Sequence, residues 1–134
     1  MNCCTFFNEI NLNKRNIKLE MHHIPFTITD LINIAIEYFI QNDIELNDLE
    51  IAEFVMLWHY TGLVGVLPLS KTVHTLYHDG QIFIPLTYPF GNVIGFYNEY
   101  KDYMTNTLRT KFKKLVDKTK EFNNEPPEIL RKRF

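Results

Sequence analysis

The stretches 19-LEMHHIP-25 and 67-LPLSKTVHTLYH-78 hold four of the five histidines of the chain. In the first stretch and just before it, apolar Ile17, Leu19 and Met21 alternate with polar residues. This period-two pattern predicts a strand whose apolar side chains form one buried face, and Pro25 marks its end.

The second stretch predicts a strand that leads directly into a helix. The apolar run from Val64 to Leu69 is typical of a strand, and Ser70 is a suitable N-cap for a short helix through His78. Asp79 and Gly80 then favour the end of that helix. The histidines are therefore expected at the end of one strand and along the helix that follows another.

Two helices are expected between these stretches. Apolar residues recur at helical spacing from Thr27 or Thr29 to about Gln41. Asn47 can cap a second helix that runs through Tyr60, with Glu50 three positions later as in a capping box. The two helices form a helical insertion over residues 24–62.

The C-terminal half predicts one extended segment and one long helix. The apolar run from Ile82 to Leu86 is expected to be extended. A helix from about Asn92 to Phe122, bent or broken near Gly95, follows. Residues 1–122 then form a single domain, as the length of 134 residues favours, and residues 123–134 form a basic tail.

Composition narrows the class of protein. The hydrophobic fraction of 46% is that of an ordinary folded chain. Cys3 and Cys4 are the only cysteines, so a disulfide framework is excluded and a cytoplasmic, intracellular location is expected. The charge-free stretch from Phe54 to Ser70 is interrupted by glycine and proline and is too short to span a membrane.

Charge is unevenly distributed along the chain. Residues 1–100 carry four Lys or Arg and eleven Asp or Glu, whereas residues 101–134 carry ten and five. The insertion over residues 24–62 contains seven acidic residues and no Lys or Arg, so it is expected to face away from phosphate, as core cover or as a protein-docking surface. The basic C-terminal third is the region expected to contact a polyanion.

His74 and His78 lie four residues apart and therefore on one face of the predicted helix. Two imidazoles at this spacing can bind one metal ion. The spacing alone also fits two ordinary surface histidines. The adjacent pair His22 and His23 favours the metal site.

The order of LEMHHIP, a strand and LPLSKTVHTLYH resembles the motif of the HNH, or ββα-metal, endonucleases. The likeness is closest to the nuclease domains of DNase-type colicins. It covers about residues 17–26 and 63–80. It implies a ββα-metal core. Together with the helices expected from apolar spacing, this predicts an α+β fold with a two-helix insertion between the strands of the core and a long C-terminal helix.

The resemblance also implies roles for the site residues. His23 would be the general base that takes a proton from the attacking water, and His22, His74 and His78 would hold one divalent ion that stabilises the charge on the phosphate. Glu20, on the same strand face as His22, would orient a ligand imidazole, although a solvated carboxylate fits equally well. Zinc, nickel, cobalt or manganese suit three imidazoles better than magnesium, and the identity of the ion stays open.

Three features depart from the motif. Gly65 stands where many members have an asparagine nine positions before the first helical histidine, and Thr61 is a candidate substitute. Ser70 and Val73 stand where many members have cysteines of a structural zinc. The link between the strands is also longer than the usual loop. His59 is expected to be a packed helix residue, not a ligand.

The predicted function is a hydrolase: an endonuclease that cuts phosphodiester bonds in nucleic acid, here double-stranded DNA, of phage or mobile-element origin. Lysines would bind the phosphate backbone without sequence preference; they are Lys71, Lys111, Lys113, Lys114 and Lys118. Gly65 motivates an alternative, a catalytically weakened HNH-like module that binds nucleic acid or a protein partner. A third reading is an all-helical interaction protein that binds no metal.

Overall fold

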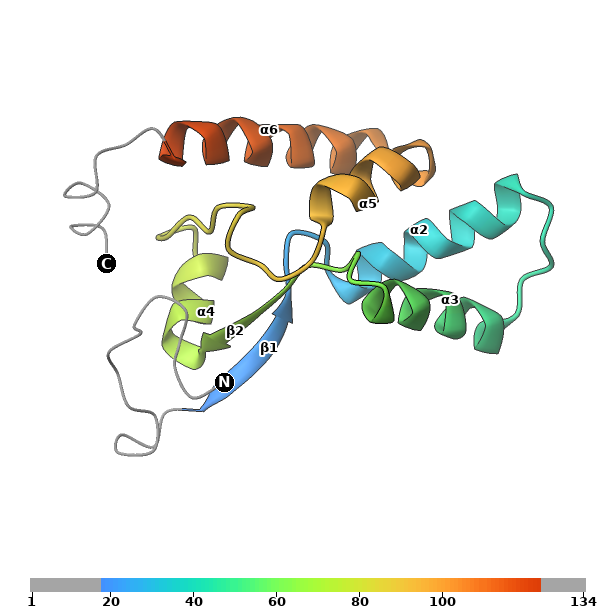
Figure 1. Ribbon diagram of the computed structural model, residues 1–134, viewed down its shortest axis with the longest axis horizontal. Coiled ribbons are helices and arrows are strands. Elements are labelled where there is room, and N and C mark those ends of the chain that lie inside the picture. The colour runs from blue at the N-terminus through green and yellow to red at the C-terminus, as the bar shows by residue number, and fades with distance from the viewer. Residues whose placement is uncertain (1–17, 124–134) are drawn as a thin grey trace.

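The computed structural model describes residues 18–123, which form an α+β fold with five α-helices and one two-stranded sheet (Figure 1). The predicted tail beyond residue 123 lies outside the described residues. In chain order the elements are β1 (Leu19–His23), α2 (Ile28–Gln41), α3 (Asp48–Tyr60), β2 (Val66–Ser70), α4 (Lys71–His78), α5 (Val93–Tyr100), a 3₁₀ turn (Lys101–Tyr103) and α6 (Asn106–Asn123).

The two strands pair in an antiparallel sheet although two helices separate them in the sequence. Leu67, which is fully buried in β2, lies opposite His22 of β1. Met21, expected on the buried face, is 55% exposed, so that part of the prediction is wrong. Met21 and His22 both lie opposite fully buried residues of β2, Pro68 and Leu67, so the register alone does not decide which side chain is covered. Helix α4 decides it, because its His74 ring stacks on the ring of His22.

Helices α2 and α3 form the expected insertion; α2 begins after Thr27, one of the two threonines at which the sequence placed its start, and α3 begins after Asn47, its predicted cap. The side chain of Thr27 accepts a hydrogen bond from the backbone N–H of Asp30, whose carboxylate accepts one from the Thr27 N–H, so both halves of a capping box are present. The side chain of Asn47 accepts from the Glu50 N–H, which is one half of the capping box expected there. The pair extends away from the sheet (Figure 1).

Strand β2 continues into α4 without a loop, as the sequence predicted. Ser70 is the last residue of the strand and the N-cap of the helix, and its side chain accepts from the Val73 N–H. Gly80, with a φ of 74°, follows the C-cap Asp79. This direct junction fixes the position of α4 relative to the sheet.

The predicted long C-terminal helix is two helices, and the break is not at Gly95. Gly95 lies in the first turn of α5, where its N–H donates to the side chain of Asn92. The chain instead leaves the helical path at Met104, which is extended and buried, and Thr105 accepts from the Leu108 N–H at the start of α6. Burial of Met104 among the other helices turns the chain there.

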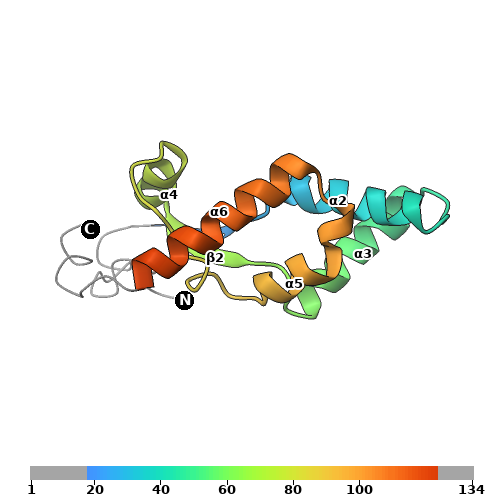
Figure 2. The same ribbon diagram turned by 90° about the horizontal axis from the view of Figure 1, so that it is seen from above.

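Helix α6 forms a separate layer above the sheet (Figures 1 and 2). The segment from residue 79 to 92 runs between α4 and α6 (Figure 1) and includes Ile82 to Leu86, which was expected to be extended and forms no strand within the described residues. The backbone N–H of Leu86 donates to the hydroxyl of Thr119 on α6, which ties the two together.

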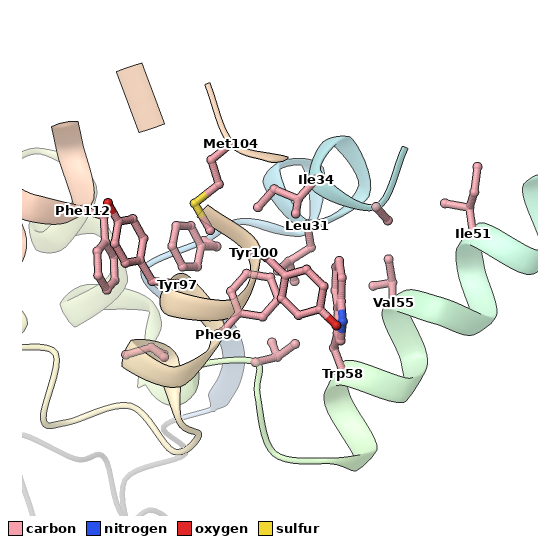
Figure 3. Packing of buried hydrophobic residues seen from close by; sticks show 14 of the residues in the cluster. Leu31, Ile34, Ile51, Val55, Trp58, Phe96, Tyr97, Tyr100, Met104 and Phe112 are labelled. Atoms are coloured by element: carbon pink, nitrogen blue, oxygen red, sulfur yellow. The ribbon is translucent and has the colours of Figure 1, made fainter. Parts of the chain in front are cut away.

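The main core lies between α2, α3, α5 and α6 and is rich in aromatic rings (Figure 3). The rings of Trp58 and Phe96 meet edge to face at 4.9 Å between centroids, and Tyr97 stacks on Phe112 at 4.3 Å. A second, smaller cluster lies under the sheet and α4 and consists of Ile24, Leu67, Leu69, Val73 and Ile84. Among the described helices, none combines the length and apolar character that crossing a bilayer needs.

Candidate metal centre and its histidines

Strand β1 and helix α4 bring three of the predicted site residues together. The ring of His22 stacks on that of His74, with 3.5 Å between centroids. The ring of His78 lies one helical turn away, 4.2 Å from that of His74. The two histidine-rich stretches of the sequence therefore meet.

Glu20, His22 and His74 each offer one ligand atom, and these atoms lie within 4.8 Å of one another. The Nε2 atom of His22 is buried and has no hydrogen-bond partner among the described residues, although a carboxylate oxygen of Glu20 is 3.5 Å away. A buried imidazole nitrogen without a partner is costly, and a metal ion would satisfy it. These residues fit a divalent ion in type and in spacing.

The group that meets is not the set of three histidines that the resemblance implied. Glu20, expected to orient a ligand, is close enough to be a ligand itself, while His78 is exposed and stands beside the group. Two imidazoles with one carboxylate are a donor set that zinc, nickel and manganese accept. The carboxylate makes the set harder than three imidazoles, which raises the affinity expected for manganese and magnesium.

His23 points to a different neighbour from His22. Its Nε2 atom lies 2.9 Å from the Nε2 atom of His59 on α3. The Nδ1 atom of His59 in turn lies 2.8 Å from the carbonyl oxygen of Val55. The ring of the predicted base is thus directed toward the insertion, because consecutive strand residues point to opposite faces and His23 follows His22 in β1.

Two imidazoles of the site have lowered pKa values. Burial, followed by the positive charges that His59 and His22 can carry, lowers the pKa of His23. Burial also lowers the pKa of His74, with help from His22 and His78 and against the opposing effect of Glu20. Both rings are therefore neutral at pH 7, the form that a base or a metal ligand needs.

Gly65 cannot be replaced by the asparagine of the motif in this fold. A Cβ atom there would collide with the carbonyl oxygen of Ile24 and a methyl group of Val93. The carbonyl of Gly65 also accepts a hydrogen bond from the Ile24 N–H. Thr61 does not take over the role, since its hydroxyl donates to the carbonyl of Leu57 at the end of α3.

The predicted phosphate-binding lysines lie in two places. Lys71 is exposed at the first turn of α4. The other four are exposed on α6, where Lys111, Lys114 and Lys118 line an open groove of about 600 Å³. Lys118 also lies over the ring of Phe83, with 5.8 Å between its Nζ atom and the ring centroid.

The sequence did not predict the contact between His59 and His23. His59 was expected to be a packed helix residue, and it is half-buried on α3, but its ring reaches His23 from 36 positions away. No local spacing connects the two residues. The one available signal is that His59 follows the buried Trp58, which places it at the edge of the buried face of α3.

Comparison with known proteins gives one finding. The family described as Bacteriophage G278-like virion protein matches residues 1–132 of the chain. Comparison with curated proteins found no match, and comparison with solved structures found none.

Proposed function

We propose that this chain, which belongs to the Bacteriophage G278-like virion protein family, is a metal-dependent endonuclease of the HNH type that acts in association with the phage particle. The observation that carries the proposal is the convergence of Glu20, His22 and His74, with the buried Nε2 atom of His22 lacking a hydrogen-bond partner among the described residues. The order β1, β2, α4 around these side chains supports an HNH ββα core.

In this proposal the residues of β1 and α4 divide the work. Glu20, His22 and His74 would hold a divalent ion, and the ring of His78 lies beside that of His74, 4.2 Å away between centroids. When bound, such an ion supplies Lewis-acid stabilisation of the negative charge that develops on the phosphate and the leaving oxygen. The proposed substrate is DNA, and Lys71 and the exposed lysines of α6 bind its phosphate backbone.

His23 is the general base of the proposed reaction. A neutral imidazole accepts a proton from water as the water oxygen attacks phosphorus and the bond to the 3′ oxygen breaks. The 3′ oxygen takes a proton from solvent, so the products are a 3′-hydroxyl and a 5′-phosphate. The lowered pKa of His23 keeps its ring neutral at the pH of the reaction.

A plasmid-nicking assay tests this function. The wild-type chain, freed of metal by EDTA and then given Mn, Ni, Mg or Zn, should nick supercoiled DNA. His23→Ala should lower the rate by about 100-fold or more while still binding zinc. His74→Ala should lose both nicking and zinc. The matched control is Thr72→Ala, an exposed residue of α4, which should behave as the wild type.

A second function is favoured by Gly65 and by the family match to virion proteins. In this case the chain binds a metal for stability and serves as a nucleic-acid- or protein-binding part of the phage particle, without cutting. Zinc binding by the wild type with no nicking under any of the four metals would select this module over the enzyme. Nicking that persists unchanged in His23→Ala would reject the assigned base.

A further inference from the structure

His59, in the last turn of α3, contacts His23 at the end of β1. Its ring and that of His23 meet edge to face, with 5.1 Å between centroids and 83° between planes. The two Nε2 atoms are 2.9 Å apart, and the Nδ1 atom of His59 is 2.8 Å from the Val55 carbonyl oxygen. These three groups form a continuous chain of hydrogen bonds.

The carbonyl group of Val55 determines which ring nitrogens of His59 and His23 carry a hydrogen. A carbonyl oxygen can only accept, so the Nδ1 atom of His59 carries the hydrogen and donates to Val55. In a neutral His59 the Nε2 atom is then a lone pair, which accepts from the Nε2–H of His23. A neutral His23 with its hydrogen on Nε2 has its lone pair on Nδ1.

We propose that His59 is a positioning residue, which holds His23 in the Nε2–H tautomer and thereby leaves Nδ1 as the basic atom. The catalytic consequence rests on the proposed nuclease function, whereas the tautomer itself does not. A ring without this partner is free to place its hydrogen on either nitrogen and to rotate. This proposal gives the helical insertion a function. Gly65 has no side chain that could orient His23, and His59 of α3 orients it instead.

A shared cation between the two rings is the competing explanation of their close approach. Two nitrogens each about 2.0 to 2.1 Å from a tetrahedral ion would be roughly 3.3 Å apart. The observed 2.9 Å is the length of a direct hydrogen bond. The geometry therefore favours the hydrogen bond.

Nuclear magnetic resonance of the wild-type chain tests the tautomer without any activity measurement. The protein would be labelled with ¹⁵N at histidine, freed of metal with EDTA and studied at about pH 8, where imidazoles are neutral. Long-range ¹H–¹⁵N correlations should show His23 as Nε2–H and His59 as Nδ1–H. Finding His23 as Nδ1–H, or as a mixture of both tautomers, would overturn the proposal.

Two variants test the consequence. His59→Phe keeps a ring but removes both nitrogens, so His23 should become a tautomer mixture and metal-dependent nicking should fall about 10- to 100-fold, with zinc affinity unchanged. His59→Gln, whose amide oxygen can accept the Nε2–H, should restore the single tautomer and much of the rate. A wild type that binds two zinc ions, one of them lost in His59→Phe, would instead establish the shared cation.

The outcomes separate the two proposals. A wild-type chain without nicking under any metal, but with the expected tautomers, refutes the nuclease and retains the positioning of His23. Nicking that is equal in wild type, His59→Phe and His59→Gln retains the nuclease and refutes the role of His59.

Discussion

The helical part of the molecule and the unit formed by β1, β2 and α4 are built on unequal cores. The first buries sixteen apolar residues in one cluster, many of them aromatic, whereas the second buries five, all aliphatic. Burial of apolar surface is the main favourable term in folding, and large rings bury the most area per side chain, so we expect most of the stability to come from the helical part. The unit with the smaller core carries four of the five histidines: His22, His23, His74 and His78.

This division separates the larger core from the candidate metal centre. In the small unit, a buried imidazole nitrogen of His22 has no hydrogen-bond partner among the described residues, and two rings have lowered pKa values. Such features cost stability, and sites of function are often found in the less stable parts of a fold. The helical insertion links the two parts, because it contributes both to the main core, through Trp58, and to the site, through His59.

Truncation in the main core is the change with the largest expected effect. Phe96 is fully buried against Trp58 and Tyr100, and Phe96→Ala should lower the free energy of unfolding by about 3 to 5 kcal/mol. Urea unfolding followed by far-ultraviolet circular dichroism measures it. Ile94→Ala on the same helix is the control, since Ile94 is 44% exposed and should change stability by less than about 1 kcal/mol. Equal losses in the two variants would contradict the assigned core.

Metal addition should stabilise the small unit by an intermediate amount. Zinc at about 100 times its dissociation constant should raise the free energy of unfolding of the wild type by about 2.7 kcal/mol, because only the folded chain holds the ligands together. His74→Ala should lose this gain, and Thr72→Ala should retain it. If His78→Ala lost the stabilisation by zinc and Glu20→Ala kept it, the ligands would be the three histidines that the resemblance implied.

The sequence predicted the parts of this fold that local interactions decide. The predicted N-caps Asn47 and Ser70 each accept a hydrogen bond from the N–H three positions later, and so does Thr27, one of the two threonines at which the first helix was expected to begin. The strand, strand, helix order was also predicted, since turn and cap residues mark its boundaries. The spacing of His74 and His78 placed them on one face, and their rings are neighbours.

What the sequence could not predict depends on contacts between distant residues. The buried face of β1 was assigned to Met21, but Met21 is 55% exposed, and α4 instead covers His22 through the ring of His74. The break before α6 follows from the burial of Met104 among other helices and has no glycine or proline to mark it. His59 lies 36 positions from its partner, so only the packing of α3 beside β1 brings the two rings together.

Acidification of the metal-free protein should give the smallest change, confined to the small unit. The pKa values of His23 and His74 are lower in the folded chain than in the unfolded chain. Below about pH 6.5 the unfolded chain therefore binds more protons than the folded chain, and the free energy of unfolding decreases as the pH is lowered. Urea midpoints in EDTA at about pH 7.5 and 5.5 measure this loss. His23→Gln and His74→Gln should each reduce it, whereas Ile94→Ala should lose as much as the wild type. A wild-type midpoint that is the same at both pH values would mean that the histidines of the small unit are no less basic than in the unfolded chain, and the contrast between the two regions would then rest on packing alone.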